Sequence, residues 1–474
     1  MNPIKLSLFV MGVILLNGAV GEEHHVCTIE ATMDPDGEAC CVKCDSLDPA
    51  LMDLMRNCPY LQKLYGYGDS ISTAINGVEL SSLPASTVGL QRLISDAGDR
   101  DTLILPGGYY TEGNISIDKN LTIYGKGYVV VDGRGNGAIL NIGKDNPNTQ
   151  VTLENINFIN GHSSKGGAII NSASLSMTRC HILNSTADNG GGISNSGTLT
   201  LEDCEFRGNG ARSGGAVYNE DNGTVVMKGC TLSSSYGEGS ALFTSRGRVV
   251  LKDCEIKGNG GDASISCFVE GSYVQLDNCS IHDNYGRCFG GGIKTLGSNL
   301  TINGGAIFNN TAIYGGRIHG QGGHITLNHV VVYDNKATLG GGGMCSHNCT
   351  VILDSVNFGG NTAKKGGAIY NYYSEVAIRG STTLSSNMAS LGGAIYNNES
   401  TTLDLLDQTT IINNHADKGA GIYNVKGSQL KIKDKSNLIQ NMAEDKGGAI
   451  YNEGVMSLNG DRIAKNIPDD IYNP

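Results

Sequence analysis

Two segments of the chain carry acidic and basic residues at the same spacing, in an arrangement that acid–base chemistry could use. In an extended strand, residues two apart lie on one face, so each segment would present its charges together. Polysaccharide hydrolysis or elimination needs paired carboxylates, or a metal with a cationic base, on such a face. A solvated surface is the competing interpretation. The residues of the two segments are Asp203, Glu205 and Arg207, and Asp253, Glu255 and Lys257. For catalysis we single out Asp203, Asp253, Arg207 and Lys257.

A second set of residues has the chemistry of metal ligands. Cys345, His347 and Cys349 alternate along one segment, and His319 lies one repeat earlier, where it would stack beneath Cys345. Thiolate and imidazole are ligands that zinc prefers. A disulfide or a coincidental stack of polar residues is the alternative. Our main expectation is that the protein uses no metal and no cofactor.

Tyrosines recur at one position of successive repeats and are the predicted contact face. Rings stacked on neighbouring repeats could simply shield the turns. Alternatively, they could bind sugar rings or another surface, as amphipathic aromatic residues do at interfaces. The predicted binding residues are Tyr370, Tyr396, Tyr423 and Tyr451, with Tyr472 and Tyr218 in the same column.

Besides Cys345 and Cys349, the cysteines fall into three groups. One group occupies a position that is apolar in other repeats (Ile156, Val330 and Val356), so we expect buried free thiols there. Near an irregular repeat, Cys267 and Cys288 are expected to form a local disulfide. The buried group is Cys180, Cys204, Cys230, Cys254 and Cys279, and the N-terminal group, whose pairing we leave open, is Cys27, Cys40, Cys41, Cys44 and Cys58.

A repeat of about 24 to 28 residues, marked by Gly-Gly-Ala-Ile-Tyr-Asn, must position all of these side chains. Between the glycine motifs, apolar residues alternate with period two, as in Leu199 and Leu201 or Val351 and Leu353. Short strands separated by turns, repeated at this period, predict a parallel β-helix of about 14 coils. Two columns of asparagine would hydrogen-bond along its axis.

The composition and the N-terminal segment limit the classes of protein to which the chain can belong. The chain has 474 residues with 68 glycines, no three-residue glycine period, and a net charge of -12, which argues against collagen and nucleic-acid binding. We expect a signal peptide at 1–21, a disulfide-stapled Cys-rich module at 22–85, and a β-helix at 86–474 that begins with a capping helix around Leu90 to Ile94. No later segment has the length of a transmembrane helix.

The motifs resemble a known family. Phe358-Gly-Gly-Asn361 followed by Gly366-Gly-Ala-Ile-Tyr-Asn371 is similar to the polymorphic outer membrane protein repeat. Residues 100–474, including the opening Leu121-Thr-Ile-Tyr-Gly125, look still closer to adhesin-like proteins of methanogenic archaea. The resemblance covers about four-fifths of the chain and implies an all-β, right-handed parallel β-helix solenoid and display at a surface.

We therefore expect an exported, secreted or cell-surface protein that is not an enzyme and that acts in adhesion or as a structural component of the cell envelope. Its expected partners are cell-surface glycans, envelope proteins, or a second copy bound through the C-terminal coil, Ile463 to Pro474. A secreted polysaccharide lyase or glycoside hydrolase on a pectate-lyase-like β-helix remains the alternative function.

Overall fold

The computed structural model describes the backbone of residues 29–33, 39–44 and 74–75, and residues 78–474 apart from 221, 269–270, 317, 434 and 460–461. The chain divides into two compact units, Met1–Cys58 and Pro59–Pro474. In the first unit, β1 (Ile29–Met33) pairs with β2 (Ala39–Cys44) in antiparallel orientation. The expected signal peptide and the cysteine side chains of the expected N-terminal module lie outside the described residues.

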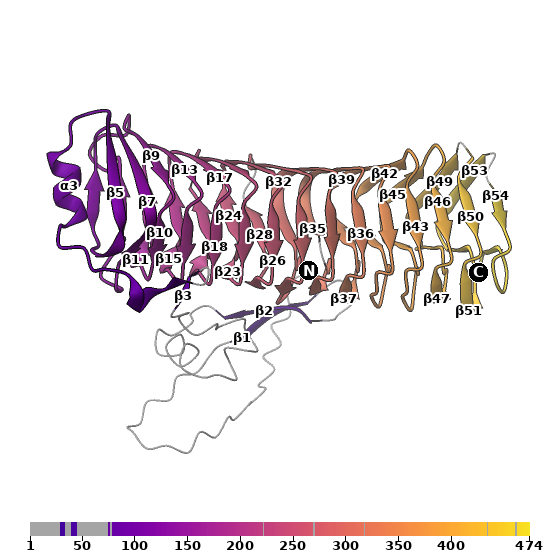
Figure 1. Cartoon of the computed structure of the whole chain (residues 1–474). Coiled ribbons are helices and arrows are strands. Elements are labelled where there is room, and N and C mark those ends of the chain that lie inside the picture. The colour runs from indigo at the N-terminus through magenta and orange to yellow at the C-terminus, as the bar shows by residue number, and fades with distance from the viewer. Residues whose placement is uncertain are drawn as a thin grey trace, which may run out of the picture. The chain divides into compact units, whose positions relative to one another are not determined.

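The second unit is a parallel β-solenoid of about 14 turns, as the repeat predicts (Figure 1). A coil such as the one from Ser174 to Asn195 contains four strands: β13 (Ser174–Thr178), β14 (His181–Leu183), β15 (Thr186–Asn189) and β16 (Ile193–Asn195). Each strand pairs in parallel with its equivalent one coil later, which is β17 (Thr198–Glu202), β18 (Glu205–Arg207), β19 (Gly210–Ser213) and β20 (Val217–Asn219) in turn. Equivalent residues of the repeat therefore form straight columns along the axis.

Period-two alternation places one face of every strand in a single continuous core. In β13, Leu175 and Met177 are buried while Ser174 is exposed. Because the inward residues of consecutive coils are in register, each apolar side chain packs above and below on its equivalents. Burial of such a side chain contributes on the order of 2 kcal/mol, so the core is the main source of stability.

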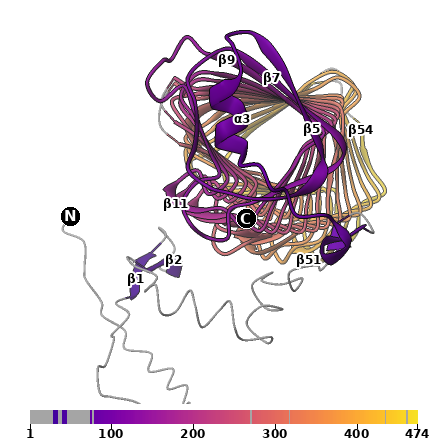
Figure 2. The same ribbon diagram turned by 60° about the vertical axis from the view of Figure 1, so that its left-hand side comes forward.

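Helix α3 (Leu90–Asp96) lies across the N-terminal end of the solenoid, where the capping helix was expected (Figure 2). Its apolar side chains Leu90 and Ile94 are buried in the same core as Leu105 of β5 (Asp101–Thr111) and Ile115 of β6 (Ile115–Ile117). The helix therefore covers apolar side chains that have no preceding coil to pack against.

A column of asparagines fills one inner corner of the solenoid, as predicted. The Nδ2 group of Asn361 donates to the Val332 carbonyl (2.9 Å) and to Oδ1 of Asn387 (2.9 Å). Its Oδ1 accepts from the backbone N–H (3.1 Å) and Nδ2 (2.8 Å) of Asn335. Each amide therefore satisfies buried polar groups of two neighbouring coils. The column continues through Asn259, Asn284, Asn310, Asn335, Asn361, Asn387, Asn414, Asn441 and Asn466.

The second asparagine column is interrupted. Its first part ends where Asn219 donates to Thr244 (3.1 Å), and asparagine returns where Ser346 donates to Asn371 (2.9 Å). Nδ2 of Asn371 and Oδ1 of Asn397 have no hydrogen-bond partner, and the amide ladder resumes where Asn397 donates to Asn424 (2.7 Å). In the coils between Asn219 and Asn371, other residues take the place of asparagine. The hydroxyl of one of them, Thr295, has no hydrogen-bond partner. The positions that replace asparagine there are Thr244, Cys267, Thr295, Gly320 and Ser346.

The five-cysteine column is buried and consists of free thiols, as expected. The turn explains the choice of residue: Cys254 Sγ donates to the Lys252 carbonyl (3.2 Å), while Thr382 in a later coil donates to the Arg379 carbonyl (2.7 Å). A thiol or hydroxyl at this position can therefore satisfy a carbonyl of the turn, whereas Ile156, Val330 and Val356 fill the same space with apolar side chains. The expected disulfide between Cys267 and Cys288 is wrong, because Cys267 is a free thiol whose pKa is raised to about 12 by burial.

Replacing Asn361 by alanine should lower the free energy of unfolding by about 3 kcal/mol, because buried backbone and amide groups of the adjacent coils lose their partners. The midpoint of urea unfolding measures the effect. Asn357→Ala, which truncates an exposed asparagine of the same coil, is the control and should shift the midpoint little. Equal shifts for the two variants would contradict the structural role of the column.

Candidate functional site

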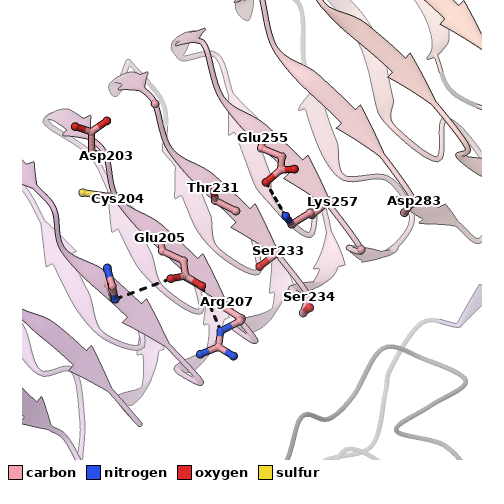
Figure 3. A pocket seen from close by; sticks show the side chains of 13 residues that line it. Asp203, Cys204, Glu205, Arg207, Thr231, Ser233, Ser234, Glu255, Lys257 and Asp283 are labelled. Atoms are coloured by element: carbon pink, nitrogen blue, oxygen red, sulfur yellow. Dashed lines mark hydrogen bonds and ion pairs between the residues drawn. The ribbon is translucent and has the colours of Figure 1, made fainter. Parts of the chain in front are cut away.

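A groove of about 720 Å³ opens on the outer face of the strand that carries the predicted charges (Figure 3). It spans β14, β18, β22 (Thr231–Ser233) and β26 (Glu255–Lys257), which pair in that order. The groove is lined by His181, Asp203, Cys204, Glu205, Arg207, Gly229, Thr231, Ser233, Ser234, Glu255, Lys257, Gly258 and Asp283.

The groove exists because side-chain size changes from coil to coil. Thr231 and Ser233 are short, whereas the outward residues of the two flanking strands are long and charged. The middle strand is therefore a floor of hydroxyl groups between two walls of ion pairs. In-register pairing forms one column of Glu205, Thr231 and Glu255 and another of Arg207, Ser233 and Lys257.

The first wall is centred on Glu205. This carboxylate lies 3.3 Å from Nε of Arg207 and 3.9 Å from Nδ1 of His181. Burial lowers the pKa of His181, although the charge of Glu205 opposes that shift. Burial, and then the charge of Glu205, raise the pKa of Tyr128 to about 12, so Tyr128 is a neutral hydrogen-bonding group beside the groove at physiological pH.

The second wall is centred on Glu255. Its carboxylate accepts from Nζ of Lys257 (2.7 Å) and lies 3.2 Å from Nε2 of His282, whose Nδ1 is 2.7 Å from Asp283. These contacts, with the Lys257 hydrogen bond the largest, lower the pKa of Glu255. Both walls therefore hold their charges in preformed pairs.

The two aspartates selected from the sequence have a structural role in turns. Asp203 and Asp253 both adopt a left-handed backbone conformation (φ 52°), which aspartate tolerates better than most residues. Asp253 accepts from Nδ2 of Asn278 (2.8 Å) and is not part of the groove lining, whereas Asp203 lies at its edge. The predicted catalytic set is thus only partly brought together, with Arg207 and Lys257 inside the groove.

The groove is better suited to hydrogen bonding than to proton transfer. A general acid needs a carboxyl group whose pKa is raised toward neutrality, but the pKa of Glu255 is lowered. Glu205 and Glu255 are two strand spacings apart, about 10 Å, which is at or beyond the upper limit for the carboxyl pair of an inverting glycosidase.

An aromatic strip continues the groove along the same sheet, and the sequence analysis missed it. His282 of β30 (Ser280–His282) stacks on Phe308 of β33 (Ala306–Phe308) at 4.7 Å, and Phe308 stacks on Tyr333 of β36 (Val331–Tyr333) at 4.8 Å. The repeat offset could have revealed it, because these residues follow Lys257 in one column.

The predicted tyrosine column stacks as expected but is not an exposed strip. Ring centroids of consecutive tyrosines from Tyr370 to Tyr451 are 4.7 to 5.5 Å apart. Lys365 lies over Tyr396 (5.4 Å) and Lys418 over Tyr451 (5.5 Å). The four side chains Tyr370, Tyr396, Tyr423 and Tyr451 are only 7 to 9 % exposed, so their faces are not available for stacking on a sugar.

The predicted metal ligands lie on neighbouring strands but do not converge. His319 pairs with Cys345 in register, as expected, whereas the ring of His347 packs at a tilt against Tyr372 (5.0 Å between centroids) and Cys349 Sγ donates to the Gly322 carbonyl (3.4 Å). Within residues 78–474, gaps aside, no three histidine, cysteine or acidic side chains are grouped so that they could hold a metal ion.

Two family models match the chain. The right-handed beta helix region matches residues 109–272, and the Chlamydia polymorphic membrane protein repeat matches residues 355–372. The chain is therefore similar to right-handed β-helix proteins over residues 109–272 and to the polymorphic membrane protein repeat over residues 355–372. These two matches confirm the resemblance suspected from the sequence. A search of curated proteins gave no match.

Two solved structures are similar at low identity. One is the catalytic unit of a thermostable GH87 alpha-1,3-glucanase from Streptomyces thermodiastaticus: 12 % identity, covering 82 % of this chain and 68 % of that chain, TM-score 0.35. The other is PfbA, a surface adhesin of Streptococcus pneumoniae: 8 % identity, covering 79 % of this chain and 87 % of that chain, TM-score 0.20. In the part of the chain that the structure describes, no helix is long and apolar enough to span a membrane.

Acid should destabilise the solenoid through His319. This imidazole is buried against Phe289 (4.3 Å), its Nδ1 has no hydrogen-bond partner, and burial, aided by the charges of Lys294 and His347, lowers its pKa to about 3. Below pH 6.5 the unfolded chain binds a proton here that the folded chain does not. The contribution to stability therefore falls by about 1.4 kcal/mol per pH unit from pH 6.5 toward 3.

Urea unfolding of wild type, His319→Phe and His324→Phe between pH 7 and 3.5 measures this effect. His319→Phe should lose less stability than wild type on acidification, and the exposed control His324→Phe should follow wild type. A parallel pH profile for His319→Phe and wild type would show that the unfavourable protonation lies elsewhere.

Proposed function

We propose that the protein is an exported, non-catalytic β-helix rod that acts at a cell surface as an adhesin-like protein, with the groove and the aromatic strip as its contact face for a glycan. The observation that carries the proposal is the combination of a hydroxyl floor, paired charges and adjacent aromatic rings on one outer sheet. Such a surface offers both hydrogen bonds and apolar contact, the two requirements for binding a sugar.

The match to the polymorphic membrane protein repeat supports surface display. The sequence-based expectation of a signal peptide at 1–21 agrees with it. Envelope proteins, or a second copy of the chain bound through Ile463 to Pro474, are further candidate partners.

The preformed ion pairs support binding rather than catalysis. Glu205 and Glu255 each have a cationic partner within 3.3 Å, so a ligand meets groups whose orientation is fixed before it arrives. Preorganisation lowers the entropy cost of binding. The same pairing holds Glu255 in its ionised form, the opposite of what an acid catalyst requires.

A secreted polysaccharide lyase or glycoside hydrolase is the second candidate function. It is favoured by one observation: carboxylates from two strands face each other across an open groove. In that case Glu205 and Glu255, rather than Asp203 and Asp253, would carry the reaction.

Removing the groove cations should abolish attachment without unfolding the rod. We expect the double variant Arg207→Ala/Lys257→Ala to bind whole cells and a glycan array at least tenfold more weakly than wild type, because both walls lose their orientation. The matched control is Arg379→Ala/Lys431→Ala, which breaks two exposed ion pairs on more distant coils (2.9 and 3.6 Å) and should bind as wild type does.

A turnover screen tests the enzymatic alternative on the same proteins. The purified chain is incubated with neutral and acidic polysaccharides, with and without calcium, and new reducing ends or unsaturated products are measured. We expect none. Turnover that is lost in Glu205→Gln or Glu255→Gln would overturn the non-catalytic assignment.

A further inference from the structure

The aromatic strip ends in an open notch. Tyr333 stacks on Phe308 with one ring face, and the residue in register on its other side is Gly359 of β40 (Asn357–Gly359). A Cβ atom added to Gly359 would meet nothing nearer than 3.9 Å. The hydroxyl of Tyr333 makes no hydrogen bond within the described residues. The second ring face and the phenol group are therefore both available to a ligand.

We propose that this notch is a subsite for one pyranose ring of a neutral glycan, stacked on the free face of Tyr333. The proposal rests on the proposed function and names its ligand class. The apolar C–H face of a pyranose matches an aromatic ring face, and the Tyr333 hydroxyl supplies one polar contact.

Apart from Val331, the outward side chains around the notch are polar and uncharged. After Gly359, the next residue in the column is Ser385 of β43 (Thr383–Ser385). Amide and hydroxyl groups beside an aromatic platform can satisfy sugar hydroxyls without an ionic partner. The six outward positions of the three strands are Val331, Tyr333, Asn357, Gly359, Thr383 and Ser385.

Charge in the adjoining groove excludes a polyanion as the preferred ligand. The groove lining contains four acidic residues, Asp203, Glu205, Glu255 and Asp283, against two fixed cations, Arg207 and Lys257. Both cations are already paired with carboxylates, and the whole chain carries a net charge of -12. An acidic polysaccharide would be repelled by this field, whereas a neutral one would not.

The groove and the notch lie along one column of side chains parallel to the axis. A ligand that contacts both must therefore be extended. Five strand spacings, about 24 Å, separate the groove floor at Ser233 from the notch at Gly359. A linear glycan lying along this column would contact the hydroxyl floor, the edges of the stacked rings and the notch in turn. The column runs Ser233, Lys257, His282, Phe308, Tyr333 and Gly359.

The test fills the notch without disturbing its surroundings. Gly359 is a strand residue without a left-handed conformation, so Gly359→Val suits the backbone and should fold with equal or greater stability. Its side chain would occupy the space against Tyr333. Tyr333→Ala removes the platform, and Tyr333→Phe, which keeps the ring face, is the matched control.

Calorimetric titration with neutral hexasaccharides (cellohexaose, chitohexaose, maltohexaose and mannohexaose) and with polygalacturonate provides the measurement. We expect at least one neutral hexasaccharide to bind, with Kd at least tenfold higher for Gly359→Val and Tyr333→Ala and within about threefold of wild type for Tyr333→Phe.

Three results would overturn the subsite: binding of polygalacturonate alone, binding of no neutral member, or an unchanged Kd in Gly359→Val. The last result, together with loss of binding in Arg207→Ala/Lys257→Ala, would leave the groove as the contact face and remove only the notch. If the groove variants and the notch variants all attach to cells as wild type does, that result would instead count against the proposed function itself.

Discussion

The structure depends on in-register stacking of one coil on the next at a single strand spacing. The buried asparagines enforce that register, because each amide hydrogen-bonds to the backbone of the preceding coil and to the amides of the coils on both sides, as Asn361 does. A shift of one residue would leave these groups unsatisfied inside an apolar core, at a cost of about 1 to 3 kcal/mol each. The outward side chains of successive coils are therefore aligned in columns in the same way.

Because register is fixed, the outer surface can change only through the size and chemistry of side chains within a column. Short residues between long ones make a groove, as Thr231 and Ser233 do, and a glycine after a tyrosine makes a notch, as Gly359 does. The scaffold therefore needs no inserted loop to build a binding face. Variation at a few outward positions is sufficient, and the fold is left unchanged.

The sequence predicted the features that follow from the repeat alone. The coil, the asparagine columns, the capping helix and the buried thiols of the five-cysteine column all depend on periodicity and on which positions are apolar. The Cys267–Cys288 disulfide was wrong because proximity in an irregular repeat was mistaken for pairing, whereas Cys267 lies in register with Thr244 and Thr295.

Features that depend on a side chain's surroundings could not be predicted in the same way. The spacing of the sequence located the charged residues of the groove. It led us to select Asp203 and Asp253 rather than Glu205 and Glu255 as catalytic residues, because the left-handed turn conformation of the two aspartates is not visible in the spacing. The tyrosine column was expected to face solvent, yet Lys365 and Lys418, the latter in β47 (His415–Lys418), lie over the rings of Tyr396 and Tyr451. His282 and Tyr333 lie in strands without the Gly-Gly motif that drew attention to the tyrosines, whereas Phe308 follows Gly304-Gly305-Ala306.

The interruption of the second asparagine column has a mechanical consequence. In a solenoid, the free energy that joins neighbouring coils is a sum of local contacts. Between Thr244 and Ser346 the hydrogen bonds of that ladder are missing, so under tension along the axis the coils would begin to separate in this segment. The aromatic strip lies on the same coils. A polymer bound across groove and notch would bridge coils that lack these hydrogen bonds and share the load that they carry.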